Sequence, residues 1–116
     1  MLYVPEASPS LNLFTYSHWR KQHTMKARWA KWLLVEVKRT GAAIATGKRR
    51  LTIERHGKRR LDIDNILGGA KGCITDNLRA LKMLVDDDDT SIEFVARNAK
   101  LIKGESAHTV IYLEDM

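Results

Sequence analysis

The spacing of apolar residues along the chain predicts two amphipathic helices. Over roughly residues 17–39, Trp29, Leu33 and Val37 recur on one side at 100° per residue, and lysines and arginines fall near the other side. Trp29 is expected in the core rather than stacked on nucleic-acid bases. From residue 66 to 84, apolar side chains follow a second helical spacing of 3, 4, 4 and 3 residues. Each segment therefore has an apolar face that must be buried.

Shorter runs in which apolar and polar residues alternate predict β-strands. Two of these runs flank His56-Gly57, a turn signal, so they indicate a β-hairpin that ends near Asp64. Pro5 directly follows the first run, which favours the edge of a sheet because proline has no N–H for the ladder. The predicted strands cover residues 2–4, 49–55, 59–63, 92–96 and 110–113, the last two antiparallel, with a turn at 56–58 and loops at 6–12 and 41–47.

The size and composition of the chain predict one domain. With 116 residues, 44% of them hydrophobic, it is long enough for one real core and too short for two. We therefore expect residues 1–116 to form a single α+β domain with a small mixed or antiparallel sheet and two main helices.

Cysteine usage and the absence of long apolar runs predict the compartment. The lone Cys73 excludes an intrachain disulfide and a cysteine-based zinc site, and it fits a reducing cytoplasm. No apolar run approaches the roughly 18 residues that span a bilayer, and the first residues lack a signal-peptide pattern. We expect a soluble, unexported, cytoplasmic protein with no membrane partner.

The net charge of +6 is unevenly distributed along the chain. Residues 1–60 hold 14 lysines and arginines against three glutamates, a net +11, whereas residues 61–116 hold 6 against 11 acidic residues, a net −5. The basic excess favours a polyanion such as nucleic acid as partner, with ordinary solubility charge as the alternative. A metal-dependent nuclease needs this combination, because cations hold phosphates and carboxylates hold the metal.

Two groups of carboxylates suggest a metal site. Asp62 and Asp64 would share one face of an extended segment, and the following helix could bring the run from Asp86 to Asp89 back toward them. All-oxygen ligation suits a hard cation such as Mg²⁺. The alternatives are structural, since Asp64 or Asn65 could cap the helix and four consecutive aspartates on a loop are by default solvated.

Three glycines lie near the start of the second helix, Gly68, Gly69 and Gly72. Each costs roughly 1 kcal/mol relative to alanine there, so something must approach the backbone closely. A phosphate, a neighbour of the metal site or a packed helix would each explain them. Lys71, seven residues after Asp64, projects from nearly the same side of a helix. It could hold a substrate phosphate or stabilise transition-state charge, or it could pair with the carboxylate at the helix start.

These residues together resemble the RusA family of Holliday-junction resolvases, in particular its phage and prophage members. The similarity rests on Arg59-Arg60-Leu61-Asp62-Ile63-Asp64-Asn65-Ile66, Gly68-Gly69-Ala70-Lys71, Asp76 and Leu84-Val85-Asp86-Asp87. Pro9-Ser10-Leu11-Asn12 and His18-Trp19 extend it over nearly the whole chain. The resemblance implies a homodimeric α+β endonuclease, dependent on Mg²⁺ or Mn²⁺, that resolves four-way DNA junctions by paired symmetric nicks.

By this resemblance, Asp62 and Asp64 match the metal-binding pair of the family and Lys71 its catalytic lysine. Lys71 lies about one helical turn later than in the shortest members, which preserves its face. The expected mechanism is metal-assisted phosphodiester hydrolysis. The residues expected to hold DNA by its backbone are Lys21, Arg28, Lys31, Arg55, Lys58, Arg59 and Arg60.

The third metal ligand is expected from the acidic run. Asp87 matches it if the preceding helix carries one inserted residue, and Asp86 or Asp89 are the alternatives. Two other functions stay open, a catalytically silent DNA-binding protein and a nuclease for flaps or replication forks. If the protein is a silent DNA-binding protein, Asp64→Asn leaves its metal affinity unaltered. A junction resolvase and a flap or fork nuclease use the same chemistry, so only a comparison of substrates separates them.

Overall fold

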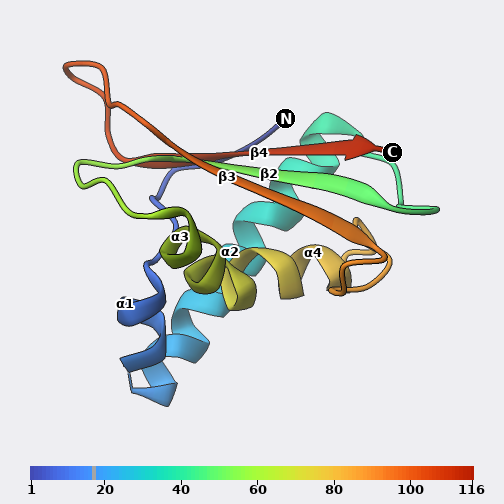
Figure 1. Ribbon diagram of the computed structural model, residues 1–116, viewed down its shortest axis with the longest axis horizontal. Coiled ribbons are helices and arrows are strands. Elements are labelled where there is room, and N and C mark those ends of the chain that lie inside the picture. The colour runs from blue at the N-terminus through green and yellow to red at the C-terminus, as the bar shows by residue number, and fades with distance from the viewer. Residues whose placement is uncertain (17) are drawn as a thin grey trace.

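We describe the fold from a computed structural model, which places residues 1–16 and 18–116. Four strands form one mixed sheet, and the helices pack against one of its faces (Figure 1). The predicted single-domain α+β class is confirmed. The elements are β1 (Leu2–Val4), α1 (Leu11–Tyr16), α2 (Trp19–Thr40), β2 (Arg49–His56), α3 (Ile63–Ala70), the π-helical turn η1 (Lys71–Thr75), α4 (Asp76–Ala80), β3 (Ile92–Ala99) and β4 (His108–Asp115).

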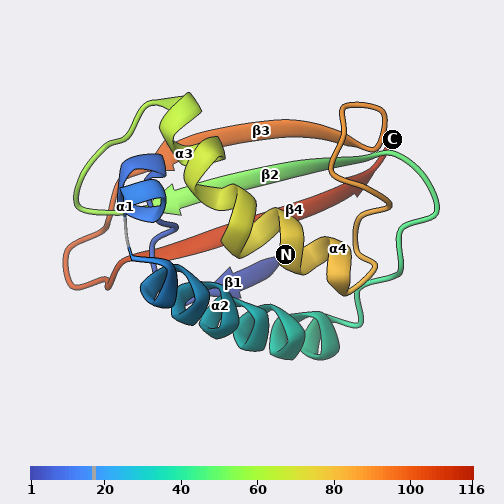
Figure 2. The same cartoon turned by 90° about the horizontal axis from the view of Figure 1, so that it is seen from below.

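The strand order in the sheet is β1-β4-β2-β3. Ile53 on β2 pairs with Ile111 of the antiparallel β4 on one side and with Ala96 of the parallel β3 on the other. β1 pairs with β4 alone, which confirms the predicted edge strand. A parallel pair needs a crossover connection, and the segment α3–η1–α4 provides it across the face of the sheet (Figure 2).

The hairpin predicted after β2 is wrong. Residues 57–62 form no strand, and the chain enters α3 at Ile63. Both edges of β2 are occupied by β3 and β4, so no ladder position remains for residues 59–63. The two runs predicted at 92–96 and 110–113 are strands of opposite direction, but β2 lies between them, so they do not pair.

The first predicted helix is confirmed as α2, although its expected start at residue 17 lies outside the described residues. Its buried side includes Met25, Trp29 and Leu33, and Trp29 is fully buried, as expected for a core tryptophan. Gly41 ends the helix in the left-handed conformation and donates its N–H to the carbonyl of Val37. Burying one such apolar side chain contributes roughly 1.5–3 kcal/mol, so this stripe fixes α2 against the sheet.

The second predicted helix is interrupted and ends earlier than expected. It starts at Ile63, and the N–H of Asp76 donates to the carbonyl of Lys71, an i to i+5 bond that widens the helix into η1. The four residues 72–75 are all buried in this turn, a run that one stripe of a regular α-helix would not bury. α4 ends at Ala80, and Lys82 follows with a positive φ of 64°.

Residues 11–16 form a helix, α1, whose first two residues lie in the predicted loop 6–12 and whose remainder no sequence signal predicted. The hydroxyl of Ser10 accepts the N–H of Leu13 at 3.0 Å, an N-cap that starts α1. A Cβ at Gly69 would overlap the carbonyl oxygen of Pro9, and one at Gly72 would lie 2.6 Å from the ring of Phe14. Of the three explanations for the glycines, the packed helix is the one observed.

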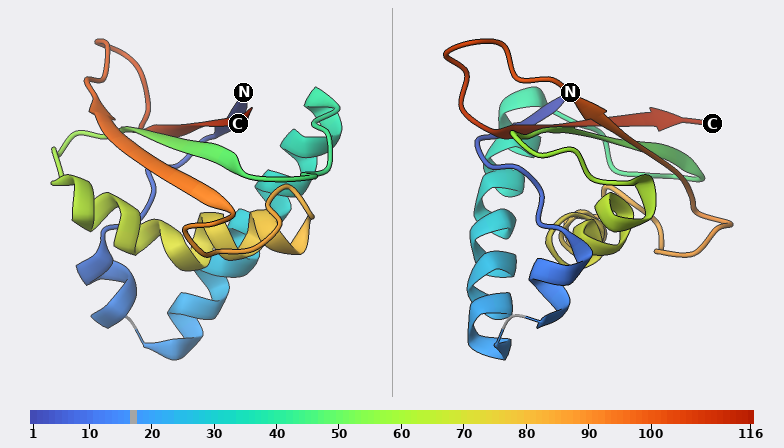
Figure 3. Two further views of the ribbon diagram at one scale, coloured as in Figure 1. Left: turned by 45° about the vertical axis from the view of Figure 1, so that its right-hand side comes forward. Right: turned by 60° about the vertical axis from the view of Figure 1, so that its left-hand side comes forward.

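α1 and the beginning of α2 extend away from the sheet, whereas the β3–β4 connection projects from the opposite side (Figure 3). No helix among residues 1–16 and 18–116 has the length and hydropathy that crossing a membrane requires.

Candidate active-site groove and basic surface

A groove of about 340 Å³ runs between the crossover helix and the start of β3. Lys71 of η1, Asp87 of the acidic run and Phe94 of β3 all line it. The remaining lining residues are Leu67, Gly68 and Thr75. The structure therefore brings together Lys71 and Asp87, which lie in separate sequence motifs. No sequence signal singled out Phe94, because a phenylalanine in an alternating strand is most simply a core residue.

Asp62 is the N-cap of α3. Its backbone is extended, with φ −70° and ψ 162°, and its Oδ1 accepts the N–H of Asn65 at 2.8 Å. The predicted cap at Asp64 or Asn65 is therefore wrong. The shared-face argument for Asp62 and Asp64 also fails, because it required one extended segment, whereas Asp64 lies in the first helical turn.

Side-chain hydrogen bonds hold the segment that leads to Asp62. The amide of Asn98 donates to the carbonyl of Leu61 at 2.5 Å and accepts its N–H at 3.1 Å. Arg55 donates to the carbonyl of Ser8 at 2.9 Å and to that of Arg59 at 2.7 Å. These bonds replace the ladder of the predicted hairpin and fix the start of α3 next to β3.

Asp64, in the first turn of α3, and Lys71, which directly follows α3, are both exposed, and the helical spacing of seven residues projects them from nearly the same side. Neither side chain forms an ion pair or hydrogen bond with any residue that the structure describes. The purely structural alternative, a Lys71 ion pair with the carboxylate at the helix start, is thus not observed. Both charges remain available to a ligand.

The four aspartates of the acidic run differ in their surroundings. Asp86 and Asp87 both face Arg79 of α4, with Nη1 3.6 Å from Oδ1 of Asp86 and 3.2 Å from Oδ2 of Asp87. Asp88 shapes the turn, since its carboxylate accepts the Thr90 hydroxyl, which lowers the pKa of Asp88, and the N–H of Ser91. Asp89 is exposed and has no such partner in the described part of the chain. Asp87 is the member of the run that lines the groove.

The donor chemistry of the carboxylates suits a hard divalent cation, but their arrangement does not yet form a site. Within the described residues, no three side chains of histidine, cysteine, aspartate or glutamate lie close enough to hold a metal ion together. The cap on Asp62 and the ion pair on Asp87 hold these two carboxylates in other contacts. A metal ion bound by Asp87 would compete with Arg79 for this carboxylate.

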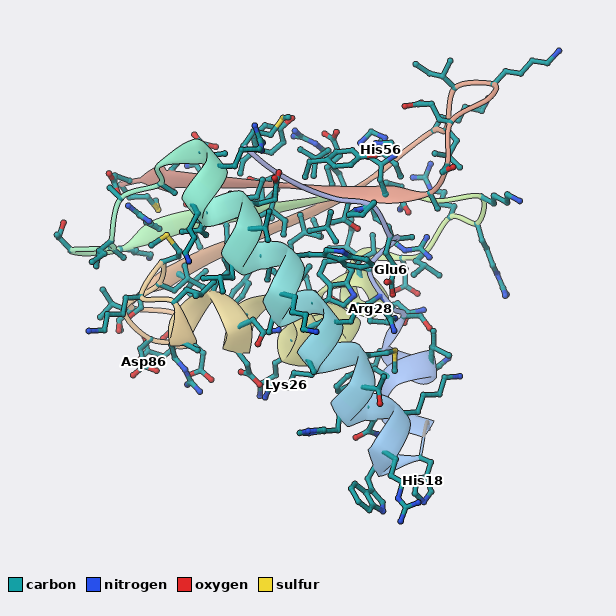
Figure 4. The ribbon with its side chains drawn as sticks, turned by 180° about the vertical axis from the view of Figure 1, so that it is seen from behind. Glu6, His18, Lys26, Arg28, His56 and Asp86 are labelled. Carbon is teal, nitrogen blue, oxygen red and sulfur yellow. The ribbon has the colours of Figure 1, made fainter. Side chains whose placement is uncertain are left out.

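Two of the seven residues expected to contact DNA are already engaged within the protein. Arg28 makes a bidentate pair with Glu6 at 2.7 and 2.8 Å, which raises the pKa of Arg28, and the two side chains point toward each other (Figure 4). Arg55 is half-buried, and burial lowers its pKa. The other five are exposed and form no ion pair with a described residue: Lys21, Lys31, Lys58, Arg59 and Arg60.

A basic depression of about 500 Å³ lies where β2 and β3 end. Its charged lining consists of Lys58, Arg60 and Lys100, with Gly57, Asn98 and Ala99 between them. The parallel register pairs His56 with Ala99, so it sets Lys100 beside the loop that follows β2. Sequence reasoning missed Lys100, because the hairpin prediction gave β2 a different neighbour. We name this surface the basic depression.

Comparison with known proteins adds no family assignment. The chain matches no family model, and no curated protein matches it at a significant level. The likeness to the RusA family thus rests on the motif residues themselves.

Proposed function

We propose that the protein is a divalent-metal-dependent endonuclease for branched DNA, of the RusA resolvase type. The observation that carries the proposal is that Lys71 and Asp87, from two separate motifs, line one groove, with Asp64 in the first turn of the helix that leads to it. The basic depression supports it, because it lies beside the segment that leads to Asp62. A carboxylate and a lysine that pairs with no described residue, together with a second, basic surface, are suited to a phosphodiester.

In the proposed mechanism, Asp62, Asp64 and Asp87 hold one or two Mg²⁺ ions, which Mn²⁺ could replace. When bound, the metal would supply an activated water and neutralise charge on the scissile phosphate. Lys71 would place its ammonium against a non-bridging phosphate oxygen, where charge increases in the transition state. It can do so without giving up an ion pair, since none with a described residue holds it.

The proposed substrate is a four-way junction, recognised through the positions of its phosphates. Lys58, Arg60 and Lys100 would bind backbone beside the cut, where no base identity is read. Paired symmetric nicks require two sites related by a two-fold axis, so the active form is proposed to be a homodimer.

A cleavage assay tests the proposal. Synthetic four-way junction, flap and linear duplex are incubated with the protein in Mg²⁺ or Mn²⁺, with EDTA and Asp64→Asn as negatives. Asp89→Asn is the matched control, because it removes a carboxylate from the acidic run without touching the groove. Paired nicks on the junction, lost with Asp64→Asn and kept with Asp89→Asn, are expected. Preferential cleavage of the flap would reassign the substrate to flaps or forks.

A second candidate is a silent DNA-binding protein, favoured by the internal contacts of Asp62 and Asp87. It predicts binding of branched DNA without cleavage in either metal. Calorimetric titration with Mn²⁺ separates the two, since the silent protein gives the same weak metal binding for wild type and Asp64→Asn.

A further inference from the structure

Phe94 is an exposed aromatic residue on the side of β3 that otherwise faces the core. Its neighbours on this side, Ile92 and Ala96, are only 2% and 8% exposed, whereas Phe94 is 39% exposed. The ring lines the groove together with Leu67, Lys71 and Asp87. The strand therefore presents one large apolar side chain inside a groove that also holds two of the candidate catalytic charges, Lys71 and Asp87.

Phosphate binding alone does not explain why the groove has an apolar lining. The phosphodiester is polar and charged, so Lys71 and a metal would serve it, whereas Phe94 and Leu67 would gain nothing from it. A nucleobase has an apolar face that stacks on an aromatic ring, and it is covalently attached next to the phosphate. A groove of about 340 Å³ has room for one base beside the reacting group.

We propose that Phe94 stacks on an unpaired nucleobase next to the phosphate that Lys71 holds. The inference rests on the proposed nuclease function and specifies its substrate class, namely DNA with an unpaired or readily unstacked nucleotide at the cut. A base inside a continuous duplex cannot reach the groove without leaving its stack, which disfavours linear DNA. Because every base has a π-face, stacking would select structure rather than sequence at this nucleotide.

Fluorescence of 2-aminopurine placed at the branch point tests the inference without cleavage. Wild type in EDTA is compared with Phe94→Leu, which keeps apolar volume but removes the ring, and with Phe94→Tyr, which keeps the ring. Tyr3→Ala is the matched control, since Tyr3 is 41% exposed on another strand and does not line the groove. Thermal unfolding of each variant verifies the fold.

Wild type, Phe94→Tyr and Tyr3→Ala are expected to raise the fluorescence several-fold on binding, and Phe94→Leu is expected to lose most of the rise. Loss of the stack should also weaken junction binding by about 5- to 100-fold and reduce the preference for junction over duplex in cleavage. An unchanged signal and preference in Phe94→Leu would overturn the inference while leaving a nuclease intact. A change of oligomeric state in Phe94→Leu, with unchanged fluorescence per bound protein, would show instead that the ring contacts another protein chain.

A different result would reject the proposed nuclease function, namely that wild type cuts no branched DNA in Mg²⁺ or Mn²⁺. In that case a fluorescence rise that depends on the Phe94 ring would still support base stacking by a binding protein, and its absence would reject both proposals.

Discussion

Arg79 lies 3.2 Å from Asp87, so a cation from the protein itself contacts the carboxylate that we propose as third metal ligand. Both side chains are partly exposed, and pairs of this kind contribute only about 0–1 kcal/mol. Exchange of the guanidinium for a metal ion therefore costs little. Arg79 would hold Asp87 near the groove until the metal and DNA arrive.

Arg79→Gln is expected to lower the Mg²⁺ concentration needed for half-maximal cleavage by about two- to fivefold, because it removes a competitor for Asp87. Mg²⁺ titration of junction cleavage measures this shift. Arg97→Gln is the control, since Arg97 pairs with Glu54 on the sheet and not with the acidic run. A higher Mg²⁺ requirement in Arg79→Gln would mean that the arginine assists metal binding instead.

The aspartates of the acidic run are expected to have different roles, so changing each one to asparagine should have a different effect. Asp87→Asn should reduce kcat by about 100-fold or more, since a groove carboxylate is lost. Asp88→Asn should mainly lower thermal stability, because Asp88 accepts bonds from Thr90 and Ser91. Asp89→Asn should behave as wild type. Full activity in Asp87→Asn together with loss in Asp86→Asn would move the third ligand by one residue.

Lys100→Gln tests the basic depression. Loss of one phosphate contact should weaken junction binding at low salt and reduce the slope of log K against log salt concentration by about one, with kcat unchanged. Binding curves at several salt concentrations measure it. Lys103→Gln is the control from the same loop, because Lys103 does not line the depression. Equal slopes for both variants would argue against a phosphate site there.

Glu36 should make stability depend on acid pH. Its carboxylate, with the side chain 11% exposed, accepts Arg39 at 2.6 and 2.9 Å and the N–H of Tyr3 at 2.7 Å, and these bonds lower its pKa. A lowered folded-state pKa gives stability above the unfolded pKa of about 4.3, and this stability is lost as pH falls through the folded-state pKa.

We expect Glu36→Gln to unfold about 1 kcal/mol more easily in urea at pH 7, a modest value because Arg39 is exposed. The difference from wild type should shrink below pH 4. Glu114→Gln removes an exposed glutamate of β4 and should show neither effect. A difference that stays constant with pH would assign the loss to packing rather than to charge.

Lys82→Gly should stabilise the protein. Lys82 and Met83 donate to the carbonyls of Arg79 and Leu78 at 2.9 Å each, which is the Schellman pattern, and Lys82 has φ 64° where glycine is preferred. Removing the strained Cβ should add roughly 0.5–1 kcal/mol after the entropy cost of glycine. Lys103→Gly, at a position without positive φ, should destabilise instead. Thermal melts of both variants compare them.

Local patterns predicted the elements well and their partners poorly. α2 and the edge strand β1 follow from periodicity and from Pro5, which are local signals. The hairpin failed because residues 108–115, far along the chain, take the edge of β2 that residues 59–63 were expected to fill. Periodicity indicates which face of a segment is buried, but it carries no information on which strand will pair with that segment.

In the candidate site, too, local features were predicted better than contacts between distant segments. Lys71 and Asp87 line one groove, whereas Asp62 and Asp64, which the sequence grouped with them, are not among its lining residues. Lys100 was missed because it becomes a neighbour of Lys58 only through the parallel β2–β3 register. Asp62 rather than Asp64 caps α3, since the cap bond runs to Asn65, three residues on, which the extended-strand interpretation had hidden.

The order of strands in the sheet has a consequence for synthesis. β4, which follows every other element along the chain, lies between β1 and β2. Until β4 is available, β1 has no partner and β2 can pair only with β3, so the nascent chain exposes unpaired strand edges. The sheet closes only after residues 108–115 leave the exit tunnel. A chain that stalls before β4 would thus hold α3 against a sheet that lacks the strand between β1 and β2.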